Sequence, residues 1–312
     1  MQPREPSREL ARGKWPGLLG QWLDERALAG KHSSCPICKG GVDRFRFDDL
    51  EGAGTWICNN CGAGDGFHLL QQILGVDFPG AARYVQERVG KIEAKPVKPG
   101  RSEEDVVASL RSTWAAGRAL VSGDPVMLYL ARRSGTTAPP AGLRYHPALA
   151  HINEQGVRTE HPAMLARVVS HDGKPVTLHR TWLTADGQKA AVDTAKKLMT
   201  PTVKLDNVAI RLAPVVDGWL GVAEGIETAL AAGNKFRVPV WSCCTAGLLK
   251  AFRPPPEVKL LCVFGDNDRS FTGQAVAYEL ARVVTALGVE CKVVIPDAEG
   301  QDWADATKAA PA

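Results

Sequence analysis

The sequence lacks any long uninterrupted run of apolar residues. No stretch of its 312 residues approaches the roughly 18 needed to span a membrane, so we expect no membrane partner. The N-terminal cations, which include Arg8, Arg12 and Lys14, are not followed by an apolar segment, so we expect no secretory signal. No internal repeat is visible, which argues against a repeat array. These absences favour a globular protein, and 312 residues leave room for two or three domains.

The charges are spread unevenly along the chain. The net charge is +4, but residues 1–100 hold 14 basic and 12 acidic residues, residues 101–215 hold 15 and 10, and residues 216–312 hold 9 and 12. A basic middle beside an acidic end suits a protein that binds a polyanion with one part and metal ions with another.

Two closely spaced cysteine pairs are the most informative feature that is present. Cys35 and Cys38 form one pair, Cys58 and Cys61 the other, and 19 residues separate the pairs. Four thiolates at this spacing favour one tetrahedral Zn²⁺, and four protein ligands leave no position for a substrate water, so we expect a structural zinc. Two disulfides are the alternative, which the absence of a secretory signal disfavours. Free thiols and zinc together predict a reducing, cytoplasmic location.

The segment between the cysteine pairs alternates strictly. A strand at 43–48 would place Arg44 and Arg46 on one face and Phe45 and Phe47 on the other. Interleaved cations and aromatic rings suit single-stranded nucleic acid, because bases stack and phosphates pair with arginine. Alternatively, the phenylalanines pack a small core and the arginines are only solvated.

Four parts follow one another along the chain. We expect a ribbon domain with flanking helices at 1–92, a linker at 93–101 marked by Lys95-Pro96 and Lys98-Pro99, a basic α+β connecting region at 102–215, and an acidic domain at 216–312. Strand-like stretches of the connecting region are Ala163–Val169, Val176–Leu183 and Val208–Leu212.

From residue 219 onward, short buried strands alternate with helices. The predicted strands are Trp219–Ala223, Val238–Trp241, Lys259–Phe264 and Glu290–Ile295, and the clearest helix covers 273–287. This alternation predicts an α/β fold with a mainly parallel sheet covered by helices.

Acidic residues follow two of these strands. Glu224 follows the first strand, and Asp266 and Asp268 follow the third. Side chains beyond the carboxyl ends of parallel strands converge on one edge of the sheet, and grouped carboxylates suit Mg²⁺ or Mn²⁺. Asp302 and Asp305 are candidates for a third acidic corner. An Asp-x-Asp after a strand is by itself common in loops. The prediction of a metal site therefore depends on Glu224 and the Asp266–Asp268 pair together, each at the end of a strand.

These motifs resemble those of a known family. Glu224 and Asp266-Asn267-Asp268 are similar to the Toprim domain shared by bacterial-type primases, topoisomerases and some nucleases. The segment His32–Leu70, with Cys35-Pro36-x-Cys38, Asp43–Phe47 and Gly64-Asp65-Gly66, resembles the zinc ribbon of phage and plasmid primase-helicases. Glu224–Leu230 and Gly300–Asp305 resemble the Toprim variant of those primases. The connecting region, with Tyr145-His146-Pro147 and His179–Trp182, is similar with weaker motifs.

The resemblance implies template-directed synthesis of RNA primers. Glu224, Asp266 and Asp268 would bind Mg²⁺ or Mn²⁺ and act in catalysis, while ribonucleoside triphosphates and single-stranded DNA would be the substrates. Many relatives continue into a helicase, but no Gly-x-x-x-x-Gly-Lys-Ser/Thr motif occurs here, so we expect a separate helicase partner.

Further residues are candidates for supporting roles. Glu227 is expected close to the acidic site, behind the metal ligands. Candidates for contacts with the triphosphate and the template backbone are Arg180, Lys196, Lys197 and Arg211. Each of these cations is alternatively part of a solvated basic face.

Two other functions use the same motifs. A Toprim nuclease would cut DNA with the same acids, and a zinc-ribbon accessory protein would bind DNA without catalysis. A type I topoisomerase needs a tyrosine nucleophile in a further large domain, whereas the four tyrosines here lie before or within the Toprim-like region.

Overall fold

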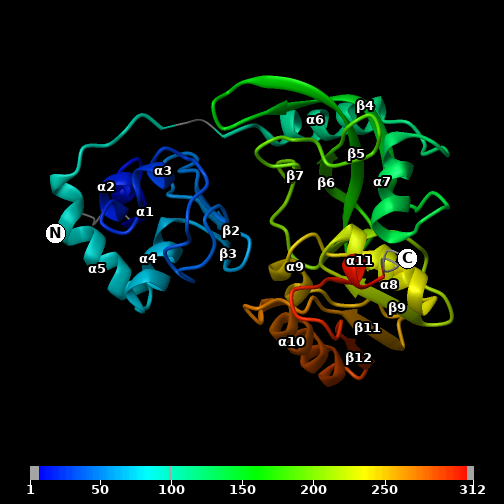
Figure 1. Cartoon of the computed structure of the whole chain (residues 1–312). Helices are drawn as coiled ribbons and strands as arrows, with labels where there is room; N and C mark the ends of the chain where they lie inside the picture. Colours follow the sequence, from blue (N-terminus) through cyan, green and yellow to red (C-terminus); the bar gives the residue numbers. More distant parts are fainter. Residues whose placement is uncertain (1–6, 98–99, 308–312) are drawn as a thin grey trace. The chain divides into compact units, whose positions relative to one another are not determined.

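The computed structural model describes residues 7–97 and 100–307, and the chain divides into two compact units, Met1–Ser102 and Glu103–Ala312 (Figure 1). Lys98 and Pro99 of the expected linker lie outside the described residues. Among the helices that are described, none has both the length and the apolar character to cross a membrane.

In the described part of the first unit, short helices pack around a three-stranded antiparallel sheet. Its strands are β1 (Phe45–Phe47), β2 (Trp56–Cys58) and β3 (Gly62–Gly64), in that spatial order. Its helices are α1 (Ser7–Ala11), α2 (Trp15–Leu19), α3 (Glu25–Leu28), α4 (Gly66–Leu74), α5 (Phe78–Arg88) and the 3-10 turn η1 (Val89–Lys91). Asp24, Asp65 and Asp77 begin α3, α4 and α5, because each side chain accepts a hydrogen bond from a backbone N–H of the first turn.

Aromatic rings from the hairpin and the helices fill the core of this unit. Phe45, Phe47 and Trp56 are at most 2% exposed and pack in one cluster with Trp15. The Phe45 and Trp56 rings stack at 6.0 Å between centroids. The prediction that Phe45 contacts nucleic acid is therefore wrong, because a fully buried ring offers no face to a base. The alternative, a small aromatic core, is what the structure shows.

Among the described residues, the second unit is built on one nine-stranded mixed sheet. The order is β12-β11-β9-β10-β8-β5-β6-β7, and β4 pairs with β5. The strands are β4 (Leu143–Ile152), β5 (Arg158–Ser170), β6 (Pro175–Trp182), β7 (Lys196–Leu198), β8 (Val208–Arg211), β9 (Trp219–Ala223), β10 (Val240–Ser242), β11 (Leu260–Phe264) and β12 (Glu290–Val294). The helices are α6 (Glu103–Ala116), α7 (Pro125–Ser134), α8 (Ile226–Phe236), α9 (Ala246–Ala251), α10 (Thr272–Ala286) and α11 (Trp303–Ala306).

One half of this sheet is parallel and the other antiparallel. Strands β10, β9, β11 and β12 run parallel, as the strand-helix alternation predicts. Strand β8 pairs antiparallel with β10 on one side and with β5 on the other. The connecting region and the parallel half therefore share one continuous sheet.

Helices cover both faces of the parallel half. Leu261 and Val263 of β11 pack with α9 and α10, whereas Cys262 and Phe264 of the same strand pack on the opposite face with α7, α8 and α11. A strand buried on both faces needs apolar residues at every position, which explains the run from Leu260 to Phe264.

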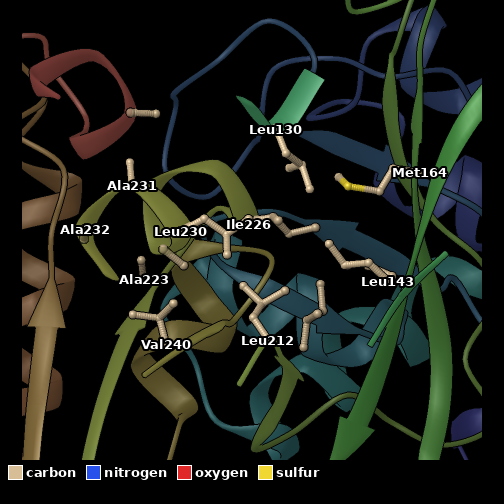
Figure 2. Packing of buried hydrophobic residues seen from close by; sticks show 14 of the residues in the cluster. Leu130, Leu143, Met164, Leu212, Ala223, Ile226, Leu230, Ala231, Ala232 and Val240 are labelled. Atoms are coloured by element: carbon tan, nitrogen blue, oxygen red, sulfur yellow. The ribbon is translucent and has the colours of Figure 1, made fainter. Parts of the chain in front are cut away.

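Helix α8 joins the two halves of the unit through the cluster in Figure 2. Ile226 and Leu230 of this helix lie beside Leu130 of α7 and Met164 of β5. All four side chains are at most 7% exposed. The helix that follows the first acidic strand end is thus held by residues of the connecting region.

Candidate functional site

The four paired cysteines of the first unit converge on one point. Cys35 and Cys38 precede β1, Cys58 ends β2, and Cys61 precedes β3. Their sulfur atoms all lie within 4.8 Å of one another, and the Sγ atoms of Cys35 and Cys61 are 3.8 Å apart. Zn–S bonds of about 2.3 Å would place sulfurs roughly 3.8 Å apart at the corners of a tetrahedron. The residues therefore fit a zinc ion, and the ribbon is a zinc-binding site with four cysteine ligands.

The thiols of this cluster differ in acidity. Burial raises the pKa of Cys35 to about 11 and also raises that of Cys61. Burial acts in the same direction on Cys38, but hydrogen bonds from Gly40 and neighbouring thiols outweigh it and lower its pKa to about 6. A bound cation would hold all four as thiolates, so metal binding releases protons.

The cations of the hairpin lie on its outer face. Arg46 pairs with Asp48 at 2.6 Å, and the Arg46 side chain is 43% exposed. Arg44 is partly exposed and lies against the glycine pair Gly40-Gly41. Both guanidinium groups are therefore accessible in part, on the face opposite the buried phenylalanines.

In the second unit, the predicted acids lie at one edge of the parallel sheet. Glu224 directly follows β9, and Asp266 follows β11 after one glycine. These strands are parallel neighbours in which Ala223 pairs with Phe264, so both acids leave the sheet at the same level. The carboxyl edge of a parallel sheet is the usual position for ligand-binding groups.

The carboxylate of Asp266 is buried in an unfavourable electrostatic environment. Its Oδ1 atom is buried and has no hydrogen-bond partner among the described residues. Burial raises the pKa of Asp266 to about 7, and the charges of Glu224 and Asp302 add to the rise. Asp268 and Asp305 act in the same direction. A divalent cation would bind the buried oxygen and would offset the repulsion between the neighbouring carboxylates, so these residues fit a metal site.

Asp268 is held in a tight turn before α10. Its carboxylate accepts hydrogen bonds from the backbone N–H groups of Thr272 at 3.1 Å and Gly273 at 2.8 Å, and from the Ser270 hydroxyl at 2.6 Å. Although burial raises the pKa of Asp268, these hydrogen bonds outweigh it and lower the pKa. Asp268 is therefore ionised at neutral pH beside the more basic Asp266.

A second loop brings Asp302 to the same edge. The backbone N–H of Asn267 donates to the Gln301 carbonyl at 3.0 Å, which ties the Asp-Asn-Asp loop to the segment before α11. Asp302 begins α11 by accepting from the N–H of Asp305, and Asp305 pairs with Arg133 of α7 at 3.4 Å. Five acids thus lie around one edge of the sheet. They are less tightly grouped than the cysteines, which form the only cluster in the described residues with three or more ligand atoms within 4.8 Å of one another.

Glu227 lies behind this edge in a buried network. Its side chain is 5% exposed, pairs with Lys196 Nζ at 2.7 Å and accepts a hydrogen bond from the Tyr129 hydroxyl. Lys197 points elsewhere and pairs with Asp193 at 3.6 Å. Tyr129 was not anticipated from the sequence, because it lies 98 positions from Glu227 and no local pattern connects the two.

The two candidate arginines of the connecting region stack on tryptophans. Arg180 lies over Trp182 at 4.9 Å, donates to the Leu198 carbonyl at 3.1 Å, and has its pKa lowered to about 10 by burial. Arg211 lies over Trp241 at 4.6 Å. Both cations are thus partly engaged within the protein, and their contacts with substrate stay predictions.

Three family models match the chain. The zinc-binding domain of primase-helicase matches residues 30–67, a domain of unknown function matches 104–210, and a Toprim domain matches 219–311. The last two matches meet near β8, where the connecting region joins the parallel half of the sheet.

Solved primase structures are similar at low identity. The zinc-binding and RNA polymerase domains of the Aquifex aeolicus primase are 14% identical, with 96% of this chain and 81% of that chain covered and a TM-score of 0.43. The primase fragment of the bacteriophage T7 primase-helicase is 15% identical, with 88% and 92% covered and a TM-score of 0.37. The RNA polymerase domain of the Mycobacterium tuberculosis primase is 16% identical, with 65% and 79% covered and a TM-score of 0.39.

Proposed function

We propose that this chain, in which a zinc-binding domain of the primase-helicase type precedes a Toprim domain, is a DNA primase that joins ribonucleotides into short RNA primers on single-stranded DNA. Both the zinc ribbon and the Toprim domain are proposed to take part in primer synthesis. The acidic edge of the sheet is the proposed catalytic site. We place the enzyme in the replication of a phage, a plasmid or a mobile element.

The observation that carries the proposal is the buried carboxylate of Asp266. Among the described residues, one oxygen of this carboxylate has no hydrogen-bond partner, and Asp266 stands beside Glu224 and Asp268 at adjacent strand ends. A protein gains nothing in stability from such an arrangement, because an unpaired buried acid costs free energy. Its presence at the carboxyl edge is therefore best explained by a divalent cation.

Glu224, Asp266 and Asp268 are the proposed ligands of that cation. When bound, Mg²⁺ or Mn²⁺ would neutralise the charge of a triphosphate and lower the pKa of the attacking 3′-hydroxyl. Asp302 and Asp305 are proposed to support the ligands electrostatically. The Ser270 hydroxyl and two backbone N–H groups fix the orientation of Asp268 before any substrate arrives.

Lys196 is proposed to bind phosphate. Its ion pair with Glu227 fixes the ammonium group, while the side chain keeps 36% of its surface exposed. Lys197, Arg180 and Arg211 are proposed to contact the triphosphate or the template backbone, and the ribbon cations Arg44 and Arg46 to bind template. The proposed substrates are single-stranded DNA and ribonucleoside triphosphates.

The family resemblance supports two further proposals. A separate helicase would open the duplex that this enzyme copies, and a cytoplasmic location would keep the thiolates of the ribbon reduced.

An incorporation assay tests the proposed function. Purified protein is incubated with unprimed single-stranded DNA, Mg²⁺ or Mn²⁺, and labelled ribonucleotides. Short labelled RNA is the expected product, and an Asp266→Asn variant should make none. Shortened DNA without incorporation would instead indicate a Toprim nuclease, and binding without either product would indicate a DNA-binding accessory protein.

A further inference from the structure

The turn before α10 presents one aromatic ring to solvent. Phe271 is 70% exposed, the highest value for any aromatic side chain that the structure describes. Among the described residues, no other ring and no cation stacks on it. Most of the ring stays in water, so it contributes little of the stabilisation that a buried Phe ring gives a fold.

The backbone holds Phe271 in an unfavourable conformation. Its φ and ψ are 58° and 12°, in the left-handed region that glycine and asparagine favour. Strain of this kind persists only where the surrounding structure enforces it, and it concentrates at ligand-binding positions. The backbone conformation of Phe271 therefore costs stability, and burial of its largely exposed ring does little to offset that cost.

The same turn orients Asp268. The Phe271 N–H donates to the Asp268 carbonyl at 3.0 Å, and the next two N–H groups, of Thr272 and Gly273, donate to the Asp268 carboxylate. A Cβ on Gly273 would lie 2.6 Å from the Asp266 carbonyl oxygen, so the turn closes tightly. One short hydrogen-bonded turn thus holds a proposed metal ligand on its inside and an aromatic ring on its outside.

The two residues that precede Phe271 in the sequence are polar and exposed. Arg269, two residues earlier, is 86% exposed at its side chain and pairs with Glu299 at 2.7 Å, and Ser270 between them is also exposed. An exposed ring in the turn that holds a proposed metal ligand suits the face of a nucleobase, because base stacking on aromatic side chains tolerates any base.

We propose that Phe271 is a stacking platform for a nucleobase at the edge of the catalytic site. The inference rests on the proposed function, since the acids beside it are taken to hold nucleotide phosphates. The base comes either from the incoming ribonucleoside triphosphate or from the template strand. Both sources present the same planar π-face, and Phe271 acts as a positioning residue for whichever base occupies it.

Two substitutions separate stacking from folding. Phe271→Gly removes the ring and relieves the left-handed backbone, so the melting temperature should stay or rise. Phe271→Trp keeps a stacking surface. Leu287→Ala, at the far end of α10, is the matched control because Leu287 is also exposed, at 61%.

We expect Phe271→Gly to raise the KM for nucleotide or for template by about 5- to 150-fold, with a much smaller change in kcat. Phe271→Trp and Leu287→Ala should stay near wild type.

Photocrosslinking identifies the source of the base without requiring catalysis. One arm uses 5-iodouridine triphosphate, and the other uses single-stranded DNA that contains 5-iododeoxyuridine. Peptide mapping should place the crosslink at Phe271 in one arm, and the crosslink should disappear in Phe271→Gly but not in Leu287→Ala. A crosslink in the first arm would show that the base comes from the nucleoside triphosphate, and a crosslink in the second arm would show that it comes from the template.

The outcomes of this inference and of the proposed function are distinct. Wild-type protein that makes no primers contradicts the proposed function, whatever the crosslink shows. Wild-type protein that makes primers, together with an unchanged KM in Phe271→Gly and no crosslink at Phe271 in either arm, overturns the stacking role alone.

Discussion

Among individual residues, the three proposed metal ligands at the carboxyl edge of the sheet provide the most direct test of catalysis. Glu224→Gln, Asp266→Asn and Asp268→Asn each remove one negative charge at nearly constant size. We expect each variant to lose primer synthesis by orders of magnitude, since stabilisation of developing charge is the main catalytic contribution of a metal site. Incorporation of labelled ribonucleotide measures the rate, and DNA binding by the ribbon should persist.

Two acids outside the cluster are the controls for these variants. Asp217 and Asp297 are exposed and also flank strands, so Asp217→Asn and Asp297→Asn should be nearly silent. If all three variants of the edge kept the wild-type rate, both the Toprim site and the primase function would have to be abandoned.

Glu227 is a buried residue whose charge stabilises the fold. Burial alone would raise its pKa, but the ion pair with Lys196 and the hydrogen bond from Tyr129 lower the pKa to about 2. Such a group contributes stability that is present above its unfolded pKa of 4.5 and is lost as the pH falls towards 2. At pH 7 we therefore expect Glu227→Gln to lower the free energy of unfolding by roughly 3 kcal/mol.

Urea unfolding of the variant and of wild type between pH 7 and pH 2.5 measures this contribution. The difference between the two proteins should shrink below pH 4.5, whereas exposed Glu257→Gln should show no pH-dependent difference of this size. A difference that stays constant with pH would show that the charge of Glu227 is not the cause.

Among the elements, the β1–β2 hairpin combines a buried aromatic face with an outer cationic face. Changing both Arg44 and Arg46 to alanine leaves the core rings in place. We expect weaker binding of single-stranded DNA and a shallower dependence of affinity on salt, because fewer counterions are released. A titration at several salt concentrations measures both, and the zinc content should be unchanged.

Cys58→Ser separates this surface effect from loss of the ribbon fold. The variant removes a ligand of the cluster, so we expect loss of zinc and unfolding of the hairpin, since metal-binding free energy is folding free energy in small modules. If the double arginine variant kept the wild-type affinity and salt slope, the arginines would be only a solvated face.

For the whole molecule, the shared sheet determines which fragments fold. A fragment of residues 103–312 should unfold cooperatively, but residues 216–312 alone should not. Strand β10 would lose its partner β8, and Ile226 and Leu230 would lose their contacts with Leu130 and Met164. Circular dichroism and thermal unfolding of the two fragments test this, and a cooperative transition in residues 216–312 would contradict it.

The local patterns of the chain were sufficient for the zinc ribbon and for the acidic edge. The spacing of Cys35, Cys38, Cys58 and Cys61 predicts a cluster that the structure contains. The apolar runs that end at Glu224 and at Asp266 predict parallel strands whose ends adjoin. The first depends on the spacing of the cysteines and the second on the rule that parallel strands share an edge, so both can be read from patterns in the sequence.

Tertiary structure decided which side chains are buried, paired or left without a partner. Strand β4 escaped prediction because Pro147 and a bulge interrupt its pattern. Three features depend on contacts between distant segments: the burial of Phe45, the pair of Glu227 with Lys196, and the Asp266 oxygen that has no partner in the described part of the chain. Burial and charge neutralisation are non-local, since both depend on what the rest of the chain places around a group. The sequence could therefore locate the candidate site but not its network of charges.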